Sequence, residues 1–247
     1  MSFYLKLISK YMIYHMPLYN CEYCNFTTRL NFHMSNHYKT KKHISKILKQ
    51  LNYFNIDFII LRKQDSIFEN YGDIDLLVSF KSKKILREVF RNSKFLYYKD
   101  SKFTNVYLYK SIPHEHYYNK KLNINFDFSF DISYRSLNNK EFVPIDDSIL
   151  KNIWEKKIKV KYDDFYFFQM DEESQLIHLI CHCIFDKNKF SEYYCEKVNE
   201  LLSKINKKTF LEISQPFFYK YSENLYDLLS DKNYEDIFEE YLSFKEY

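Results

Sequence analysis

The sequence predicts an α+β fold, in which a small metal-binding module and a helical C-terminal region flank a mixed-sheet α/β domain. Three observations predict it: four cysteines and histidines at regular spacing near the N-terminus, apolar runs with a period of two in the middle of the chain, and helical periodicity in the last third. The expected boundaries are a leader over 1–18, the metal-binding module over 19–44, the α/β domain over 45–170 and the helical region over 171–247.

The composition is biased toward aromatic residues and almost lacks glycine. The 247 residues include 25 Tyr and 24 Phe but one Gly, where average usage would give roughly seventeen glycines. So many aromatic side chains can fill a core, which argues against a disordered chain. The five cysteines, an odd number, argue against a secreted disulfide framework.

The leader and the charge layout restrict the partners. Lys6, Lys10 and His15 interrupt the apolar leader, which is too broken for a transmembrane span and has no small-residue cleavage site. We therefore expect an intracellular protein without a transmembrane segment; the pattern does not distinguish cytoplasm from nucleus. Residues 27–56 carry basic side chains and no acid, which suits RNA or DNA, while the acidic stretch after residue 222 would repel them. Both stretches are equally compatible with solvated helix faces.

Four metal-ligand residues predict a zinc site. Cys21, Cys24, His37 and His43 have the spacing Cys-x2-Cys-x12-His-x5-His. Two thiolates on a tight turn and two imidazoles on a following helix form a closed tetrahedral site for structural Zn²⁺. This resembles the two-Cys, two-His zinc-finger family, and the long gap between the histidines resembles its RNA-associated branch. The resemblance leaves two uses open, contact with RNA or DNA and attachment of the module to the next domain. His33 is an alternative ligand.

The helix that carries His43 is expected to continue into the next domain. Ile44, Ile47, Leu48 and Leu51 repeat at the spacing of one buried helix face. No stretch rich in Gly, Ser or Pro separates the module from the α/β domain.

Two apolar runs, residues 55–63 and 73–80, predict neighbouring buried strands. The period of two places Asp73 and Asp75 on one face of the second run. Two carboxylates on a buried face repel each other, and a divalent cation removes that cost. The lone glycine, Gly72, directly precedes them and suits a tight turn. A helix is expected to follow, with Leu86, Val89 and Phe90 facing inward.

A third carboxylate is expected from the run 122–134, which alternates regularly and predicts one long strand. Asp127 and Asp131 share its polar face, about 13 Å apart at ~3.3 Å per residue. Only one of them can therefore join the pair after Gly72. The alternation alone leaves both aspartates open for this role.

The motifs "ILRK", "GDIDLLV", "DFSFDISYRS" and "LIHLICHCIFDK" together resemble the nucleotidyltransferase superfamily that includes DNA polymerase beta. The resemblance covers roughly residues 50 to 195. It implies that Asp73, Asp75 and Asp127, with Asp131 as the substitute for Asp127, hold Mg²⁺ and catalyse transfer of a nucleotidyl group from an NTP to an unknown acceptor, with pyrophosphate leaving. Nearby positive charge makes Arg62, Lys63 and Arg135 candidates for binding the nucleotide phosphates, and Gly72 suits the close approach of a phosphate.

One departure from the superfamily pattern leaves a second hypothesis open. Many members have a Gly-Ser or Gly-Gly pair about ten residues before the aspartates, whose amides cradle phosphate, and this chain has none there. The alternative is a zinc-finger nucleic-acid-binding or adaptor protein that carries a catalytically inactive nucleotidyltransferase fold.

Two histidine-containing segments have competing interpretations. His178, Cys181 and His182 could share one helix face and bind metal, but the surrounding apolar residues favour core packing. His114 and His116 are expected to lie in a loop.

Overall fold

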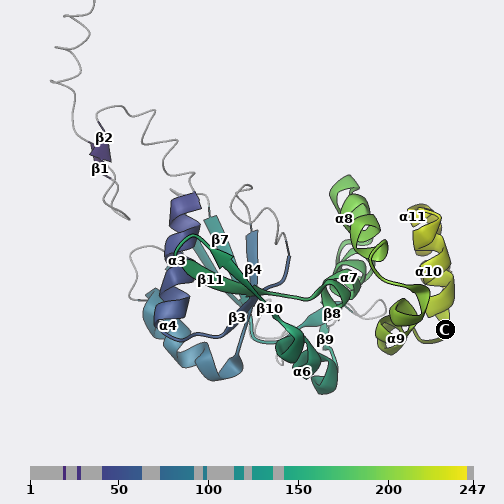
Figure 1. The fold of residues 1–247 in the computed structure, drawn as a ribbon, viewed down its shortest axis with the longest axis horizontal. Coiled ribbons are helices and arrows are strands. Elements are labelled where there is room, and N and C mark those ends of the chain that lie inside the picture. Colours follow the sequence, from purple (N-terminus) through teal and green to yellow (C-terminus); the bar gives the residue numbers. More distant parts are fainter. Residues whose placement is uncertain are drawn as a thin grey trace, which may run out of the picture.

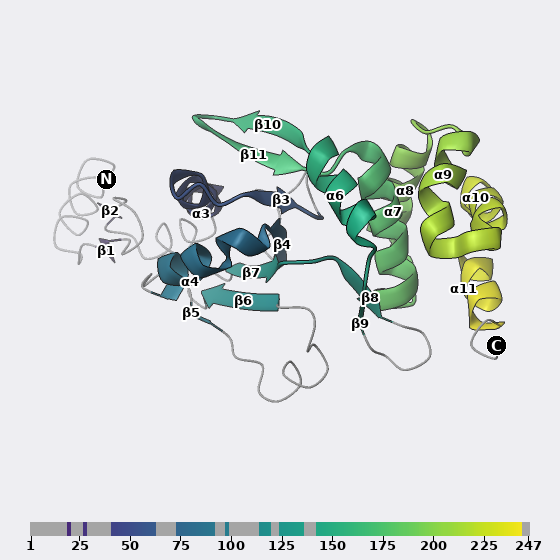
Figure 2. The same cartoon turned by 90° about the horizontal axis from the view of Figure 1, so that it is seen from below.

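The computed structural model describes residues 19–20, 27–28, 41–62, 73–91, 97–98, 114–119, 124–135 and 142–243. These residues form a mixed β-sheet with helices α3 and α4 near one end and a group of helices at the other (Figures 1 and 2). The α+β class and the mixed sheet predicted from the sequence are therefore confirmed. No helix among the described residues is both long and apolar enough to cross a membrane.

The main sheet has seven strands, which Figure 2 shows in spatial order. They are β10 (Ile158–Tyr162), β11 (Phe165–Gln169), β3 (Phe58–Ile60), β4 (Asp73–Val78), β7 (Ile124–Ser129), β6 (His114–Asn119) and β5 (Tyr97–Tyr98). The pairs β11–β3 and β4–β7 are parallel, and the other neighbours are antiparallel.

Helices cover both faces of the main sheet. The α-helices are α3 (Lys41–Tyr53), α4 (Lys83–Arg91), α6 (Asp147–Lys156), α7 (Glu172–Cys181), α8 (Glu192–Leu202), α9 (Lys207–Phe218), α10 (Ser222–Ser230) and α11 (Tyr234–Ser243). Shorter turns are the 3-10 segments Phe80–Ser82 and Tyr219–Tyr221 and the π-helical turn His182–Lys187. The helical C-terminal region predicted from periodicity is confirmed over the described residues up to 243.

Alternation along the strands separates two cores. On β4, Leu76 and Val78 point to one face and Leu77 to the other. The first face packs against α3 and α4. Leu86 and Phe90 of α4 point into this core, as their helical spacing predicted. The second face packs against α6 and the C-terminal helices. Because both faces of β4 are covered, the strand is buried from its second residue onward.

Helix α3 contains the predicted continuation after His43. Ile44, Ile47, Leu48 and Leu51 are fully buried, so the helix packs directly on the sheet across the expected boundary at residue 44. His43 is also fully buried. The other three expected zinc ligands, Cys21, Cys24 and His37, and the alternative His33 fall outside the described residues, which therefore give no support for the zinc finger. The short strands β1 (Tyr19–Asn20) and β2 (Thr27–Thr28) pair on either side of that segment's cysteines in the sequence.

The long strand predicted over 122–134 is wrong in its second half. Strand β7 ends at Ser129, the chain bends at Phe130 and Asp131, and a separate strand, β8 (Ser133–Arg135), pairs with β9 (Phe142–Pro144). The neighbours of β7 explain the break, because its ladders with β4 and β6 both end at Ser129. Beyond that point the main sheet supplies no further partner in the described residues.

Candidate functional site

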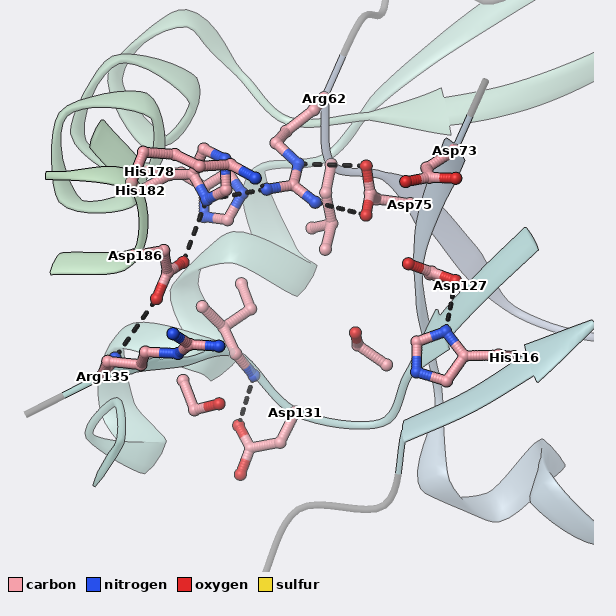
Figure 3. Close-up of a pocket in the computed structure, with 15 residues that line it drawn as sticks. Arg62, Asp73, Asp75, His116, Asp127, Asp131, Arg135, His178, His182 and Asp186 are labelled. Atoms are coloured by element: carbon pink, nitrogen blue, oxygen red, sulfur yellow. Dashed lines mark hydrogen bonds and ion pairs between the residues drawn. The ribbon is translucent and has the colours of Figure 1, made fainter. Parts of the chain in front are cut away.

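A polar pocket lies between the sheet and helix α7. Its volume is about 310 Å³, and six of the eight residues predicted for the Mg²⁺ and nucleotide site line it. The labelled side chains in Figure 3 are Arg62, Asp73, Asp75, His116, Asp127, Asp131, Arg135, His178, His182 and Asp186. Two predicted nucleotide-binding residues, Lys63 and Gly72, belong to a part of the chain that the structure does not describe.

The three predicted aspartates meet because β4 and β7 are parallel neighbours. Asp75 is the register partner of Asp127, and Asp73 is the register partner of Asn125. The Asn125 side-chain amide donates to Asp73 Oδ1 at 2.9 Å and to Asp127 Oδ1 at 3.3 Å. Figure 3 shows Asp73, Asp75 and Asp127 around one space at the end of the pocket away from Arg135. The carboxylates of Asp73 and Asp127 are thus close enough to share a single nitrogen.

Asp131 lies elsewhere in the same pocket. The bend after β7 separates it from the other aspartates, and its Oδ1 accepts a hydrogen bond from the Ile132 backbone N–H at 2.7 Å. Burial raises the pKa of Asp131, and that hydrogen bond only partly opposes the shift. The geometry therefore favours Asp127, and not its substitute, as the third carboxylate.

Arg62 forms the closest contact of the aspartate group. Its Nε donates to Asp75 Oδ2 at 3.0 Å and its Nη2 donates to Asp75 Oδ1, which makes the pair bidentate. Both side chains are largely buried. Burial opposes the charged guanidinium, but the Asp75 carboxylate outweighs it and raises the pKa of Arg62. Arg62 is therefore a permanent cation at this site.

His116 was missed by the sequence prediction, which placed it in a loop. The segment is strand β6, and His116 is the register partner of Asp127. Its Nδ1 lies 2.5 Å from Asp127 Oδ1. An imidazole and a carboxylate on adjacent strands form a pair that can hold a proton between them. No local signal identifies it, since the contact depends on which strand pairs with β7.

Helix α7 and the π-helical turn supply the opposite wall. Arg62 Nη1 lies 2.7 Å from the ring nitrogens of His182, whose Nδ1 lies 2.9 Å from Asp186 Oδ2. Asp186 Oδ1 accepts the Arg135 backbone N–H at 3.2 Å. A chain of polar contacts therefore runs from Asp75 through Arg62 and His182 to β8, and links the sheet to the helical region. Turns of π-helix are frequent at functional sites.

His178 is a buried polar side chain of this wall. The Tyr134 hydroxyl and the His178 Nδ1 form a hydrogen bond at 2.7 Å, and the His178 Nε2 has no hydrogen-bond partner among the described residues. Burial, with the nearby Arg62 cation, lowers the pKa of His178 well below the ordinary value. Burial also lowers the pKa of His182, although the Asp186 carboxylate opposes the shift. Core packing of this segment, as predicted, is confirmed by the burial of both histidines.

These lowered pKa values predict acid sensitivity of the fold. Below the ordinary histidine pKa of about 6.5 the unfolded chain takes up protons that folded His178 and His182 do not, so stability falls as the pH falls. We expect the free energy of unfolding, measured by urea denaturation, to be about 1–2 kcal/mol lower at pH 5.5 than at pH 7. His178→Gln, whose amide can still hydrogen-bond to Tyr134 but does not titrate, should flatten this dependence. An unchanged pH dependence in that variant would contradict the assignment.

In the conformation described, the side chains around the pocket do not form a complete set of metal ligands. Within the described ranges, no group of three or more His, Cys, Asp and Glu side chains is arranged to hold a metal ion. Asp75 instead directs both of its oxygens to Arg62. The donors themselves are carboxylate oxygens, which Mg²⁺ prefers.

Comparisons with protein-family models, with curated proteins and with solved structures found no match to this chain.

Proposed function

We propose that the protein is a Mg²⁺-dependent nucleotidyltransferase that transfers a nucleotidyl group from an NTP to an acceptor hydroxyl. The observation that carries the proposal is the meeting of Asp73, Asp75 and Asp127 on adjacent parallel strands, beside a pocket that also contains Arg62 and Arg135. Grouped carboxylates can bind the metal ion of a metal-complexed triphosphate, and neighbouring guanidinium groups can bind its phosphates.

In the proposed reaction the aspartates have two roles, metal binding and proton transfer. Asp73, Asp75 and Asp127 would hold Mg²⁺, which when bound neutralises charge on the triphosphate. Asp127, held by His116, accepts the proton of the acceptor hydroxyl. The hydroxyl oxygen then forms a bond to the α-phosphorus, and the bond from that phosphorus to the bridging oxygen breaks, so pyrophosphate leaves.

Arg62 has two alternative partners in this scheme. Without a ligand it neutralises Asp75 through the bidentate pair. If Asp75 held the metal, the Arg62 guanidinium would be free to bind phosphate oxygens, whose geometry it matches. Arg135, on β8 at the far end of the pocket, is the second candidate for phosphate binding.

The bidentate Arg62–Asp75 pair also favours a second candidate function. If Arg62 never releases Asp75, the metal site does not form and the fold is catalytically inactive. The protein would then be an adaptor that contacts nucleic acid through the zinc-binding module. The two candidates differ in whether Mg²⁺ and NTP bind at the aspartates.

Nucleotides labelled on either the α- or the γ-phosphate separate these candidates. We expect Mg²⁺-dependent transfer of the α-label, but not of the γ-label, to RNA, to another protein or to the protein itself. Transfer of the γ-label would show phosphoryl rather than nucleotidyl transfer. The absence of both transfer and Mg²⁺-dependent NTP binding would support the inactive adaptor.

The zinc finger remains a proposal that rests on spacing alone. We expect one Zn²⁺ per chain, bound by Cys21, Cys24, His37 and His43, because this ligand set is closed and tetrahedral. Elemental analysis of purified protein measures the zinc content, and Cys21→Ser should lose the ion. Folded protein without zinc would refute the finger, and with it the proposed RNA or DNA contact of its basic segment.

A further inference from the structure

The hairpin β10–β11 has two chemically different faces. Opposite residues of an antiparallel pair share a face, so Val160 lies with Phe167 and Tyr162 lies with Phe165. That face packs into the core beneath α3. On the other face, Lys159 lies opposite Phe168 and Lys161 lies opposite Tyr166.

We call this second face the lysine–aromatic face: Lys157, Lys159, Lys161, Tyr166 and Phe168. The Lys159 Nζ lies 3.8 Å from the ring centroid of Tyr166, and the Lys157 Nζ lies 4.3 Å from that of Phe168. Lys159 and Lys161 are exposed, and Tyr166 is 39% exposed. Two lysines therefore lie over aromatic rings, and Lys161 lies opposite Tyr166 in register. Tyr166 is the exposed ring, because Phe168 packs partly against the second core.

The charge of this face is not cancelled by neighbouring acids. Lys159 and Lys161 have no carboxylate partner in the part of the chain that the structure describes, and Lys157 has the exposed Asp57 at 3.4 Å. At the hairpin turn, Asp164 pairs with Lys49 of α3, on the opposite side of the ribbon from this face. Asp163 is exposed at the tip of the turn. The face is therefore net positive.

The hairpin extends beyond the body of the sheet. Its only described register pair with β3 joins Gln169 to Ile60, and Figure 2 shows the two strands projecting past the neighbouring strands. None of its residues lines the aspartate pocket. The lysine–aromatic face is thus a surface that the proposed catalytic site does not use.

We propose that the lysine–aromatic face binds single-stranded nucleic acid. Proteins that bind single strands combine cations that contact the phosphates with aromatic side chains on which the bases stack. The lysines of β10 supply the cations and Tyr166 supplies the exposed ring. Base stacking on Tyr166 would replace its contact with Lys159 and free that ammonium for a phosphate. A duplex keeps its bases stacked within itself, so single strands are the preferred ligand.

Fluorescence anisotropy with labelled single-stranded RNA and DNA of about 15 nucleotides tests the proposal. The full-length protein is used without NTP or Mg²⁺, so the outcome does not depend on catalysis. We expect the double charge reversal Lys159→Glu with Lys161→Glu to weaken binding at least tenfold. The slope of the logarithm of affinity against the logarithm of salt concentration should fall by about 1.4 for two lost phosphate contacts.

Two matched controls distinguish loss of contacts on this face from a general change of net charge and from unfolding of the hairpin. Lys208→Glu with Lys220→Glu makes the same change of charge at exposed positions on α9 and the following turn, and should change affinity less than about twofold. Tyr166→Ala should weaken binding about tenfold with an unchanged salt slope, whereas Tyr166→Phe, which keeps the ring, should bind like the wild type. Circular dichroism checks that the hairpin variants remain folded.

The proposal would be overturned if the wild type bound neither single-stranded RNA nor single-stranded DNA. It would also be overturned if the two double charge reversals weakened binding equally, or if the hairpin variants bound as tightly as the wild type, since the contact would then lie elsewhere in the chain. Vesicles containing phosphatidylserine provide the remaining comparison. Binding to vesicles that depends on Lys159 and Lys161, without binding to oligonucleotides, would make this face a membrane-surface site instead.

Discussion

Asp127→Asn is expected to reduce nucleotidyl transfer by a factor of about 10³ or more, because in the proposed mechanism this one side chain would both hold the metal and accept the proton of the acceptor hydroxyl. The amide retains the shape of the carboxylate and can still contact Asn125 and His116, but it loses the charge and the basic oxygen. Transfer of the α-label from NTP, under single-turnover conditions with saturating Mg²⁺, measures the effect. Thermal unfolding of the variant checks that the pocket survives.

The matched control is Asp131→Asn, four residues further along the chain and in the same pocket. Asp131 lies beyond the bend, away from the other aspartates, and its main contact is with a backbone N–H. We therefore expect its activity to remain within about fivefold of the wild type, since it touches neither metal nor hydroxyl. If both variants lose activity equally, or if Asp127→Asn retains it, the assignment of Asp127 is wrong.

Arg62→Met is expected to lower the free energy of unfolding by about 3–5 kcal/mol, because it leaves the Asp75 carboxylate largely buried without its cation. The Asp75 side chain is 10% exposed and directs both oxygens at the guanidinium. The same change removes the contact with His182 on the opposite wall. Urea denaturation, with the midpoint and slope determined for each variant, measures the loss.

A second substitution and a surface pair distinguish a buried charge from a general loss of packing. Adding Asp75→Leu to Arg62→Met removes the unpaired carboxylate and should restore most of the lost stability. Lys151→Met breaks the exposed pair with Glu155 on α6 and should cost less than about 0.5 kcal/mol. A loss in Arg62→Met as small as in Lys151→Met would show that the buried pair contributes little to the fold.

Local periodicity was sufficient for much of the architecture. The spacing of apolar residues predicted the helix after His43, the strand that begins at Asp73 and the helices after residue 171, all of which the structure contains. These predictions succeeded because a helix or a strand must turn one side toward a core. The spacing of apolar residues along the element therefore shows which side that is. The hairpin β10–β11 was missed, because each of its strands is short and the alternation of Lys with apolar residues indicates a strand clearly only beside its partner.

Site residues were predictable only where they share one element. Asp73 and Asp75 are two positions apart on one strand, so the strand period alone puts them on one face. That Asp127 would join them followed from the resemblance, and its place opposite Asp75 depends on the parallel pairing of β4 with β7. The end of β7 at Ser129 likewise depends on where its two neighbours stop.

By itself, the sequence determined the α+β class, the carboxylate pair of β4 and the burial of the helix faces, because these follow from repeats within single segments. The tertiary structure alone decided that Arg62 neutralises Asp75, that His116 meets Asp127 and that His182, 120 positions from Arg62, completes the opposite wall. The physical reason is that such contacts depend on the order and register of strands and on the docking of α7. Those are set by packing across the whole core, which no spacing along one segment encodes.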